Sequence, residues 1–235
     1  MTEKQKQWDE MQATVDGLVD ALGYTIEPEV KDLVVCLNLL GCPTNASCQG
    51  HTFSEDRGLP FPWVSVSAEN NSDMKEKIIE YYEIHDSIRT PLNAEFKERY
   101  GDIDQWPASV GAQWTKEFFR RIELDSQFET YKNIEHAVEE KTNTYREKLQ
   151  SLLVTFYAER KDDTNILYGI GGVLSRLEPV RVPEDLQETF ELANRDDRIE
   201  ARKKIDSVKY DRLLAISQQE IKKITEFLKN TYFFV

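Results

Sequence analysis

The chain has 235 residues, of which 40% are hydrophobic and 31% are charged, and its formal net charge is -13. This length is sufficient to bury a sizeable core and fits one large domain. No stretch approaches the run of about eighteen uncharged apolar residues expected of a membrane span. The acidic balance opposes the phosphate attraction that underlies non-specific nucleic-acid binding. We therefore expect a single domain over residues 1–235, with a helical extension at 184–235 as a variant, that binds neither membranes nor bulk nucleic acid.

The cysteines and the start of the chain indicate the compartment. All three cysteines, Cys36, Cys42 and Cys48, fall within thirteen positions, and an odd number argues against a disulfide framework. Residues 1–6 are polar and lead into an amphipathic segment rather than the apolar core of a secretory signal. We expect a cytoplasmic protein with reduced thiols, and the sequence leaves its oligomeric state open.

Two helices are predicted at the start of the chain. The first carries a stripe of apolar residues at spacings of three and four, formed by Trp8, Met11, Val15, Leu18 and Leu22. It is expected to end near Gly23. The second is expected to begin at Pro28, whose fixed φ suits a first helical position, and to stop at Gly41. Its wide apolar face predicts that it is largely buried.

The middle of the chain gives a mixed signal. Residues 63–67 alternate as a strand does, with Val64 and Val66 expected to face inward. Ser72 is expected to cap a helix that Pro91 breaks or re-aims, and His85 lies on the apolar stripe of that helix, as a core histidine would. Residues 101–124 contain several large apolar side chains without a clear helical or strand period, so no secondary structure is predicted for them.

The second half predicts a long helix over 127–160, which would form the spine of the fold. Residues 166–177 are typical of a strand, a turn at Gly169–Gly172 and a second strand, closed by Pro179 and Pro183. Helices are expected near 184–194 and 206–230, and the apolar end at 232–235 is expected to dock onto its own domain. The helix near 206–230 is expected to carry one apolar stripe, formed by Tyr210, Leu214, Ile221, Ile224 and Leu228. The fold class is therefore α+β, a helix-dominated single domain with a small β-sheet and one long central helix.

The candidate site is the segment Thr44–His51, predicted to be a loop between a buried helix and a strand. Such a loop is held by the scaffold while its amides and side chains stay accessible. Ser47, Cys48 and His51 are expected to converge on one ligand. Gly50 would permit a positive φ and a close approach of the backbone.

Three interpretations of the Thr44–His51 segment remain open. In the first it is only a tight packed loop, with Cys48 acting as a small hydrophobe. In the second Cys48 is a nucleophile that His51 activates. In the third Cys42, Cys48 and His51 bind zinc, with Cys36 as a fourth ligand. Because the spacing C-x5-C-x5-C-x2-H differs from the paired C-x2-C of common zinc sites, no metal ligand is assigned.

The same residues carry two resemblances. The pattern T-x-x-S-C-x-G-H before a strand, formed by Thr44, Ser47, Cys48, Gly50 and His51, resembles a group of uncharacterised bacterial and phage-type proteins. More distantly, the segment is similar to the S-S-C-S-G-R loop of the tRNA wybutosine-synthesis methyltransferase family, which uses S-adenosylmethionine. Ala46 stands where that family has its first serine, and His51 where it has arginine. The likeness covers about thirty residues and bears on loop geometry.

The function expected from these observations is binding of a small anionic or nucleotide-like ligand, with or without catalysis. The pocket would be built from Thr44, Ser47, Cys48, Gly50 and His51, with Trp63 and Arg176 as further lining residues. Catalysis would depend on Cys48 and His51. The alternative is an acidic protein-protein interaction module in which the cysteine segment is structural. The sequence names neither a cofactor nor the ligand.

Overall fold

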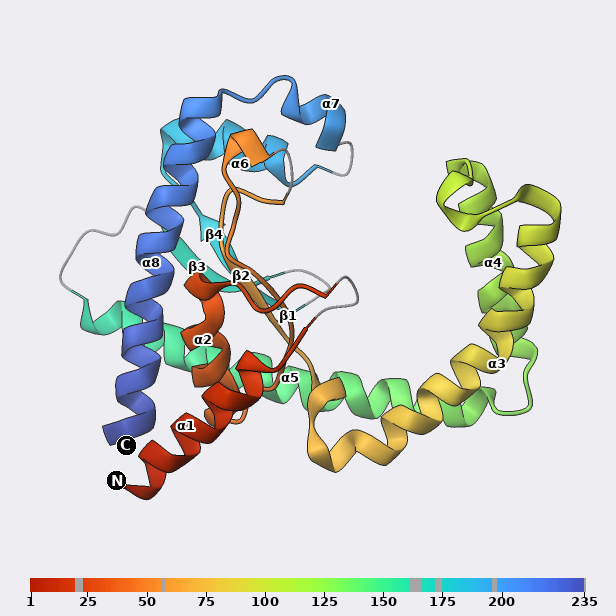
Figure 1. Cartoon of the computed structure of the whole chain (residues 1–235), viewed down its shortest axis with the longest axis horizontal. Coiled ribbons are helices and arrows are strands. Elements are labelled where there is room, and N and C mark those ends of the chain that lie inside the picture. The colour runs from red at the N-terminus through yellow and green to blue at the C-terminus, as the bar shows by residue number, and fades with distance from the viewer. Residues whose placement is uncertain (20–22, 56–57, 161–165, 172–174, 196–197, 235) are drawn as a thin grey trace. The chain divides into compact units, whose positions relative to one another are not determined.

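A computed structural model describes the chain except for residues 20–22, 56–57, 161–165, 172–174, 196–197 and 235 (Figure 1). The described residues form eight α-helices: α1 (Glu3–Asp16), α2 (Pro28–Leu39), α3 (Lys75–Tyr100), α4 (Ala108–Leu124), α5 (Phe128–Glu159), α6 (Gln187–Ala193), α7 (Arg198–Arg202) and α8 (Ser207–Phe234). They also form four strands: β1 (Thr44–Cys48), β2 (Trp63–Val66), β3 (Leu167–Gly171) and β4 (Arg176–Arg181). A helix-dominated chain with one small antiparallel sheet confirms the predicted α+β class.

The chain groups into two compact units. The larger comprises residues 1–67 and 142–235, and the smaller comprises residues 68–141. Helix α5 has 32 residues and contributes to both units. It confirms the long helix expected over 127–160. Because α5 is continuous across the boundary, the single domain expected over 1–235 stays a prediction.

The sheet of the larger unit has the order β1-β2-β4-β3, and every neighbouring pair is antiparallel. Val64 and Val66 are 0% and 1% exposed, as expected for the inward face of β2. Ser65 between them is only 4% exposed, so both faces of this strand are covered.

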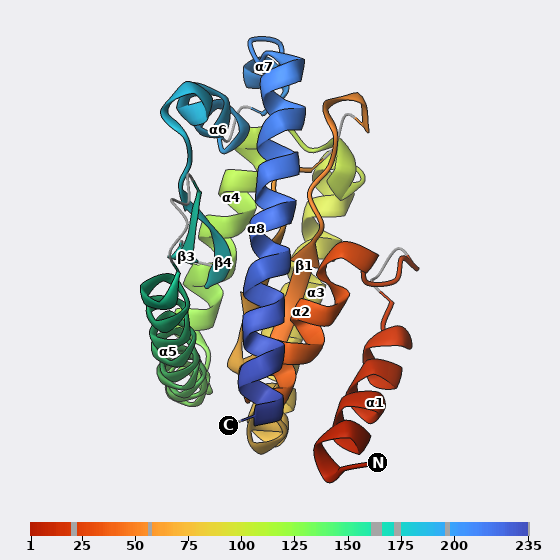
Figure 2. The ribbon, with the colours of Figure 1, turned by 90° about the vertical axis from the view of Figure 1, so that its left-hand side faces the viewer.

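Helices α2 and α8 pack together beside the sheet (Figure 2). Six of the twelve residues of α2 are buried, as its apolar face predicted: Val30, Leu33, Val34, Val35, Cys36 and Leu37. The expected stripe of α8 is buried as well, formed by Tyr210, Leu214, Ile221, Ile224 and Leu228. Burying a side chain of this size stabilises the fold by about 1.5–3 kcal/mol. This core holds the end of α2, and therefore the start of β1, in place.

The smaller unit has its own apolar core between α3 and α4. Its buried members are Ile84, Ile88, Leu92, Phe96, Val110, Phe118, Ile122 and Tyr131. The α4 members Val110, Phe118 and Ile122, with half-buried Trp114, recur at multiples of four, so a helical signal was present in the segment 101–124 that the sequence reading left unassigned. In the described residues, none of the helices combines the length and apolar character needed to span a bilayer.

Two expected helix boundaries are wrong. Helix α1 ends at Asp16 rather than near Gly23, and Val19 instead pairs with Thr25 in an isolated antiparallel bridge. Gly17 explains the stop, because glycine disfavours continuation of a helix by about 1 kcal/mol. Of the stripe expected there, Leu18 is therefore exposed, and Leu22 lies outside the described residues. The side chain of Asn71, not Ser72, caps the short 3-10 turn that precedes α3.

The predicted effects of Pro91 and Pro179 are also wrong. Pro91 lies inside α3, which continues to Tyr100. Its missing hydrogen bond costs about 3 kcal/mol, which the burial of neighbouring α3 side chains against α4 offsets. Pro179 lies within β4 opposite Tyr168 instead of closing the hairpin. It is tolerated because the pairing of β4 with β2 extends only to Leu177. The turn expected at Gly169–Gly172 is wrong for its first three residues, because β3 extends to Gly171; residue 172 lies outside the described residues.

The C-terminal aromatic residues dock only in part. The Tyr232 ring lies 6.4 Å from that of Trp8, and its hydroxyl donates to the backbone oxygen of Lys4 at 3.2 Å. Phe234 is 84% exposed. Tyr232 therefore ties α8 to α1, while Phe234 lies on the surface.

Candidate functional site

The predicted cysteine loop is largely a strand. Residues Thr44–Cys48 form β1 and pair antiparallel with β2, with Cys48 opposite Trp63. Asparagine, alanine and serine have weak strand propensity, so the sequence did not show this. Pairing with the strongly strand-forming Trp63–Val66 decides the conformation, and only Gln49, Gly50 and His51 of the predicted loop lie outside the strand.

Gly50 adopts the left-handed conformation that the sequence suggested, with φ of 78°. A Cβ on this residue would lie 2.6 Å from Leu214 Cδ1 and 2.8 Å from the carbonyl carbon of Phe61. Both the backbone angle and the close packing therefore require glycine. After Gly50, the His51 backbone N–H donates to the Leu59 carbonyl at 2.8 Å, which holds the segment that follows β1.

His51 lies between two carboxylates. Its side chain is only 7% exposed, with Nε2 3.5 Å from Glu27 Oε1 and Nδ1 3.5 Å from Glu55 Oε1. The Thr52 backbone N–H donates to Glu55 Oε2 at 2.6 Å and is the main cause that holds the pKa of the Glu55 carboxyl below its usual value. Glu55 is thus an ionised partner on one side of the imidazole, and Glu27 faces the other side.

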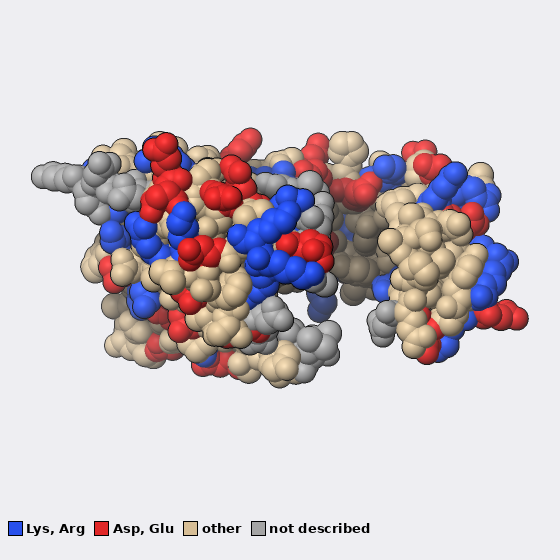
Figure 3. All heavy atoms as spheres, turned by 90° about the horizontal axis from the view of Figure 1, so that it is seen from above, with Lys and Arg blue, Asp and Glu red and all other residues tan. Residues whose placement is uncertain are grey.

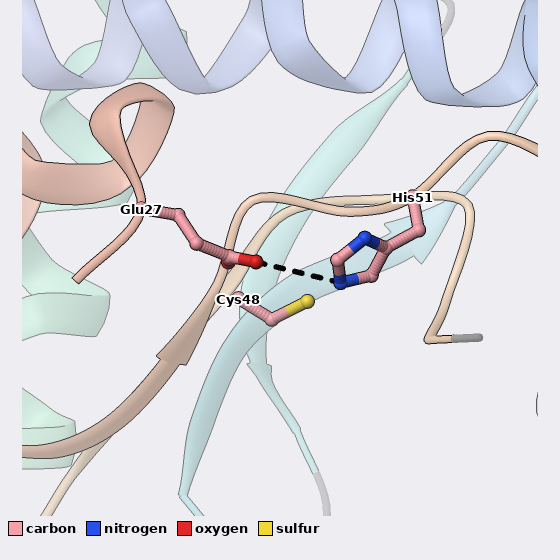
Figure 4. A group of neighbouring side chains, drawn as sticks. All are labelled: Glu27, Cys48 and His51. Carbon is pink, nitrogen blue, oxygen red and sulfur yellow. Dashed lines mark ion pairs between the residues drawn. The ribbon is translucent and has the colours of Figure 1, made fainter. Parts of the chain in front are cut away.

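Cys48 completes a cluster with His51 and Glu27 (Figure 4). A carboxylate oxygen of Glu27, Sγ of Cys48 and a ring nitrogen of His51 all lie within 4.8 Å of one another. Figure 4 shows the three side chains pointing toward one another, with Glu27 on one segment of backbone and Cys48 and His51 on another. The structure therefore brings together the Cys48 and His51 that the sequence singled out, and adds a carboxylate 21 positions before the cysteine.

Trp63 and Arg176 form a second contact on the same face of the sheet as Cys48. Residues directly opposite across antiparallel strands share a face, which places Trp63 with Cys48. The Arg176 guanidinium stacks 4.1 Å from the centre of the Trp63 ring. Arg176 lies opposite Ser65, two residues along β2 from Trp63. The two lining residues expected from the sequence therefore contact each other beside Cys48.

Thr44 and Ser47 are placed differently from the expectation. The Thr44 hydroxyl accepts from Asn38 Nδ2 at 2.9 Å, which fastens the start of β1 to the end of α2. Adjacent strand residues point to opposite faces, so Ser47 lies on the face of its partner Val64 rather than on that of Cys48. The expected convergence of Ser47 with Cys48 is therefore wrong, because the segment is extended rather than a loop.

The other two cysteines lie apart from the cluster. Cys36 and Cys42 are 0% exposed, and burial raises the pKa of Cys36 to about 12 and raises that of Cys42 as well. Cys42 Sγ lies 4.0 Å from the Tyr145 carbonyl oxygen. In the described part of the chain, the grouping of possible metal ligands around Cys48 consists of Glu27 and His51. The zinc set of Cys42, Cys48 and His51 that the sequence reading considered is thus not the set that the fold assembles.

Sequence reasoning missed Glu27 and Glu55. Glu27 occupies the N-cap position of α2, directly before Pro28, and Glu55 follows His51 by four residues. The His51 to Glu55 spacing is a local signal that could have been noticed. Nothing local connects Glu27 with Cys48, because only the packing of α2 against β1 brings them together.

The smaller unit contains a separate groove of about 470 Å³, whose lining includes Tyr81, Lys132 and His136. Lys132 pairs with Glu135 at 3.2 Å, and the Tyr81 hydroxyl bonds with that of Tyr131 at 2.8 Å. These groups satisfy one another. His85 of this unit packs against Phe118 with ring centres 4.8 Å apart, in keeping with the packing role expected for it.

Surface charge does not separate into acidic and basic regions on the face seen in Figure 3, where Lys and Arg lie among Asp and Glu.

No protein-family model matches the chain, and comparisons with curated proteins and with solved structures likewise give no match. The two resemblances noted from the motif stay predictions.

Proposed function

We propose that this chain binds a small anionic molecule, of the phosphate or carboxylate class, beside Cys48 and His51. One observation carries the proposal. Arg176 Nε is shielded from solvent and has no hydrogen-bond partner in the described part of the chain, while its guanidinium lies over the Trp63 ring, 4.1 Å from the ring centre. A buried donor without a partner is costly, and a planar guanidinium matches phosphate and carboxylate oxygens in pairs.

Neighbouring groups support the same location. Ser65 and Gly171 lie opposite Arg176 on the two neighbouring strands. Because both residues are small, a ligand can approach the backbone closely beside Arg176. A ligand there would lie on the Cys48 face of the sheet, where a thiol and an imidazole can act on it. The proposal assumes a cytoplasmic protein with reduced thiols, as the sequence predicts.

Calorimetric titration tests the proposal, with inorganic phosphate, citrate and AMP as separate probes. We expect saturable binding of at least one probe and a loss of affinity of about tenfold or more in Arg176→Gln, since a charged hydrogen bond contributes about 1.5–3 kcal/mol. Arg181→Gln, an exposed arginine on the same strand, is the matched control and should bind as the wild type does. Equal affinity in Arg176→Gln, or no saturable binding of any probe, would contradict the proposal.

The same samples address catalysis. An enzyme would convert the bound probe or a close analogue and lose turnover in Cys48→Ala while keeping most of its affinity. A binding protein would return the probe unchanged from both variants.

A further inference from the structure

We propose that Glu27, Cys48 and His51 form a binding site for a divalent transition-metal ion of the Zn²⁺ class, with one coordination position left for water or a ligand. The inference does not rest on the anion proposal, because that proposal is carried by Arg176, which is not among the metal ligands.

The spacing of the donor atoms fits tetrahedral coordination. Metal bonds of about 2.0–2.1 Å to nitrogen and oxygen place two ligands of a tetrahedron about 3.4 Å apart. His51 Nε2 and Glu27 Oε1 are 3.5 Å apart (Figure 4). With Cys48 Sγ, all three atoms lie within 4.8 Å of one another. The longer bond to sulfur, about 2.3 Å, allows the wider separation on that side.

A second layer of contacts holds each ligand in place. Glu27 Oε2 accepts the Gln49 backbone N–H at 2.6 Å, which leaves Oε1 to face His51. His51 Nδ1 faces Glu55 Oε1 at 3.5 Å, which sets Nε2 as the metal-facing nitrogen. The Gly50 backbone N–H donates to Cys48 Sγ at 3.4 Å, a contact that favours the thiolate. Carboxylate-supported histidines of this kind are the usual outer shell of metal sites.

The donor set selects the class of metal. One thiolate, one imidazole and one carboxylate suit Zn²⁺ and neighbouring transition metals, whereas Mg²⁺ and Ca²⁺ prefer oxygen ligands alone. The two anionic ligands would balance the charge of a divalent ion. Three protein ligands plus one free position are typical of a reactive zinc site rather than a structural one, which has four protein ligands.

Cobalt spectroscopy on the untagged full-length chain, stripped with EDTA, tests the site. Tetrahedral Co²⁺ bound to one thiolate gives a sulfur-to-metal charge-transfer band and intense visible bands. We expect both bands to saturate at one Co²⁺ per chain and Zn²⁺ to displace it. Cys48→Ser should abolish the charge-transfer band, and Glu27→Gln and His51→Gln should each weaken Zn²⁺ binding by about a hundredfold or more.

The controls separate ligation from folding. Cys42→Ser should keep the band, because that thiol lies outside the cluster, and far-ultraviolet circular dichroism should show that each variant is folded. If Cys48→Ser does not fold, Glu55→Gln tests the site instead, because the Glu55 side chain is partly exposed and its replacement should leave the fold intact. Loss of its contact with His51 Nδ1 should weaken Zn²⁺ binding about tenfold to a hundredfold. A wild-type chain without the charge-transfer band, a band that survives in folded Cys48→Ser, or unchanged affinity in Glu55→Gln would overturn the proposal. Because no anion is added, these results do not depend on the Arg176 titration.

Discussion

The surroundings of Cys42, just after α2, differ from those of Cys48, at the end of β1, although only six positions separate the two cysteines. Cys42 follows α2 and is fully buried, with Sγ near the Tyr145 carbonyl, while Cys48 ends β1 and is half-buried beside His51 and Glu27. The first thiol lies in the core and the second faces ionisable groups. Residue type therefore did not decide the role of either cysteine; the neighbours that the fold provides did.

The two regions also differ in what holds them. The α2 region depends on apolar packing against α8, in which the buried thiols act as small hydrophobic side chains. The Cys48 region depends on backbone hydrogen bonds to carboxylates and on a left-handed glycine. Core packing should govern stability, and the polar cluster should govern reactivity. The predictions that follow test this division.

Thiol labelling should show the largest difference. In EDTA, we expect a disulfide reagent to modify Cys48 at least about 10³ times faster than Cys36 or Cys42, since core thiols react only when the fold opens at a cost of about 5 kcal/mol or more. Time courses followed by peptide mass spectrometry measure the three rates. Cys48→Ser should have no fast thiol, and the denatured chain should label all three. A second fast thiol in the native protein would show that the core assignment is wrong.

Shortening a core side chain should cost the most stability. Leu37→Ala, at a position that is 0% exposed, should lower the free energy of unfolding by about 2–5 kcal/mol through lost burial and a cavity. Urea denaturation measures the change. Leu18→Ala is the matched control, because Leu18 is 48% exposed and its truncation should change stability by no more than about 0.5 kcal/mol. Similar losses of unfolding free energy in the two variants would contradict the placement of Leu37 in the core and Leu18 on the surface.

Two glycines with the same backbone conformation should respond differently to alanine. Gly58 and Gly23 have φ of 70° and 83°, so each alanine should cost about 1–2 kcal/mol from backbone strain. A Cβ on Gly58 would also overlap the His51 ring, whereas a Cβ on Gly23 meets nothing within 4 Å. Gly58→Ala should therefore cost about 1–3 kcal/mol more. It should also shift the His51 ring signals in NMR spectra, and unshifted signals would contradict the packing of Gly58 on His51.

Alkaline pH should destabilise the core by a smaller amount. The Cys36 pKa is raised to about 12 by burial, so the folded chain keeps this proton after the unfolded chain loses it near pH 9. The stabilising contribution is full below pH 9 and is lost between about pH 9 and 12, at no more than about 1.4 kcal/mol per pH unit. Cys36→Ala should flatten the fall in unfolding free energy measured from pH 8 to 10. An identical slope in wild type and variant would show that Cys36 is not shielded.

Much of the fold follows from local pattern. The sequence predicted the long helix, the start of α2 at Pro28 and the buried stripe of α8. Helical periodicity depends only on residues within a few neighbouring turns, so it can be recognised from local sequence. The errors occurred where long-range contacts override local preference. Pro91 stays within α3 because the helix is packed, and Thr44–Cys48 is a strand because β2 pairs with it.

The site was predictable only in part. Cys48, Gly50 and His51 are close in sequence, so their proximity needed no tertiary information. Glu27 reaches them through the packing of α2, and Arg176 reaches Trp63 through strand pairing over more than a hundred positions. Ser47 was placed with Cys48 because the segment was taken as a loop, and strand alternation puts it on the opposite face.

The sequence by itself therefore determined the α+β class, the major helices and the short motif with a thiol and an imidazole. These features depend on interactions between residues a few positions apart, which local spacing records. Only the tertiary structure decided which cysteine meets ionisable partners, which carboxylates face His51, and that Arg176 lies on Trp63. Those pairings join segments far apart in the chain, and they form because burying the apolar faces of α2, α8 and the sheet fixes where the polar ends of these elements must lie.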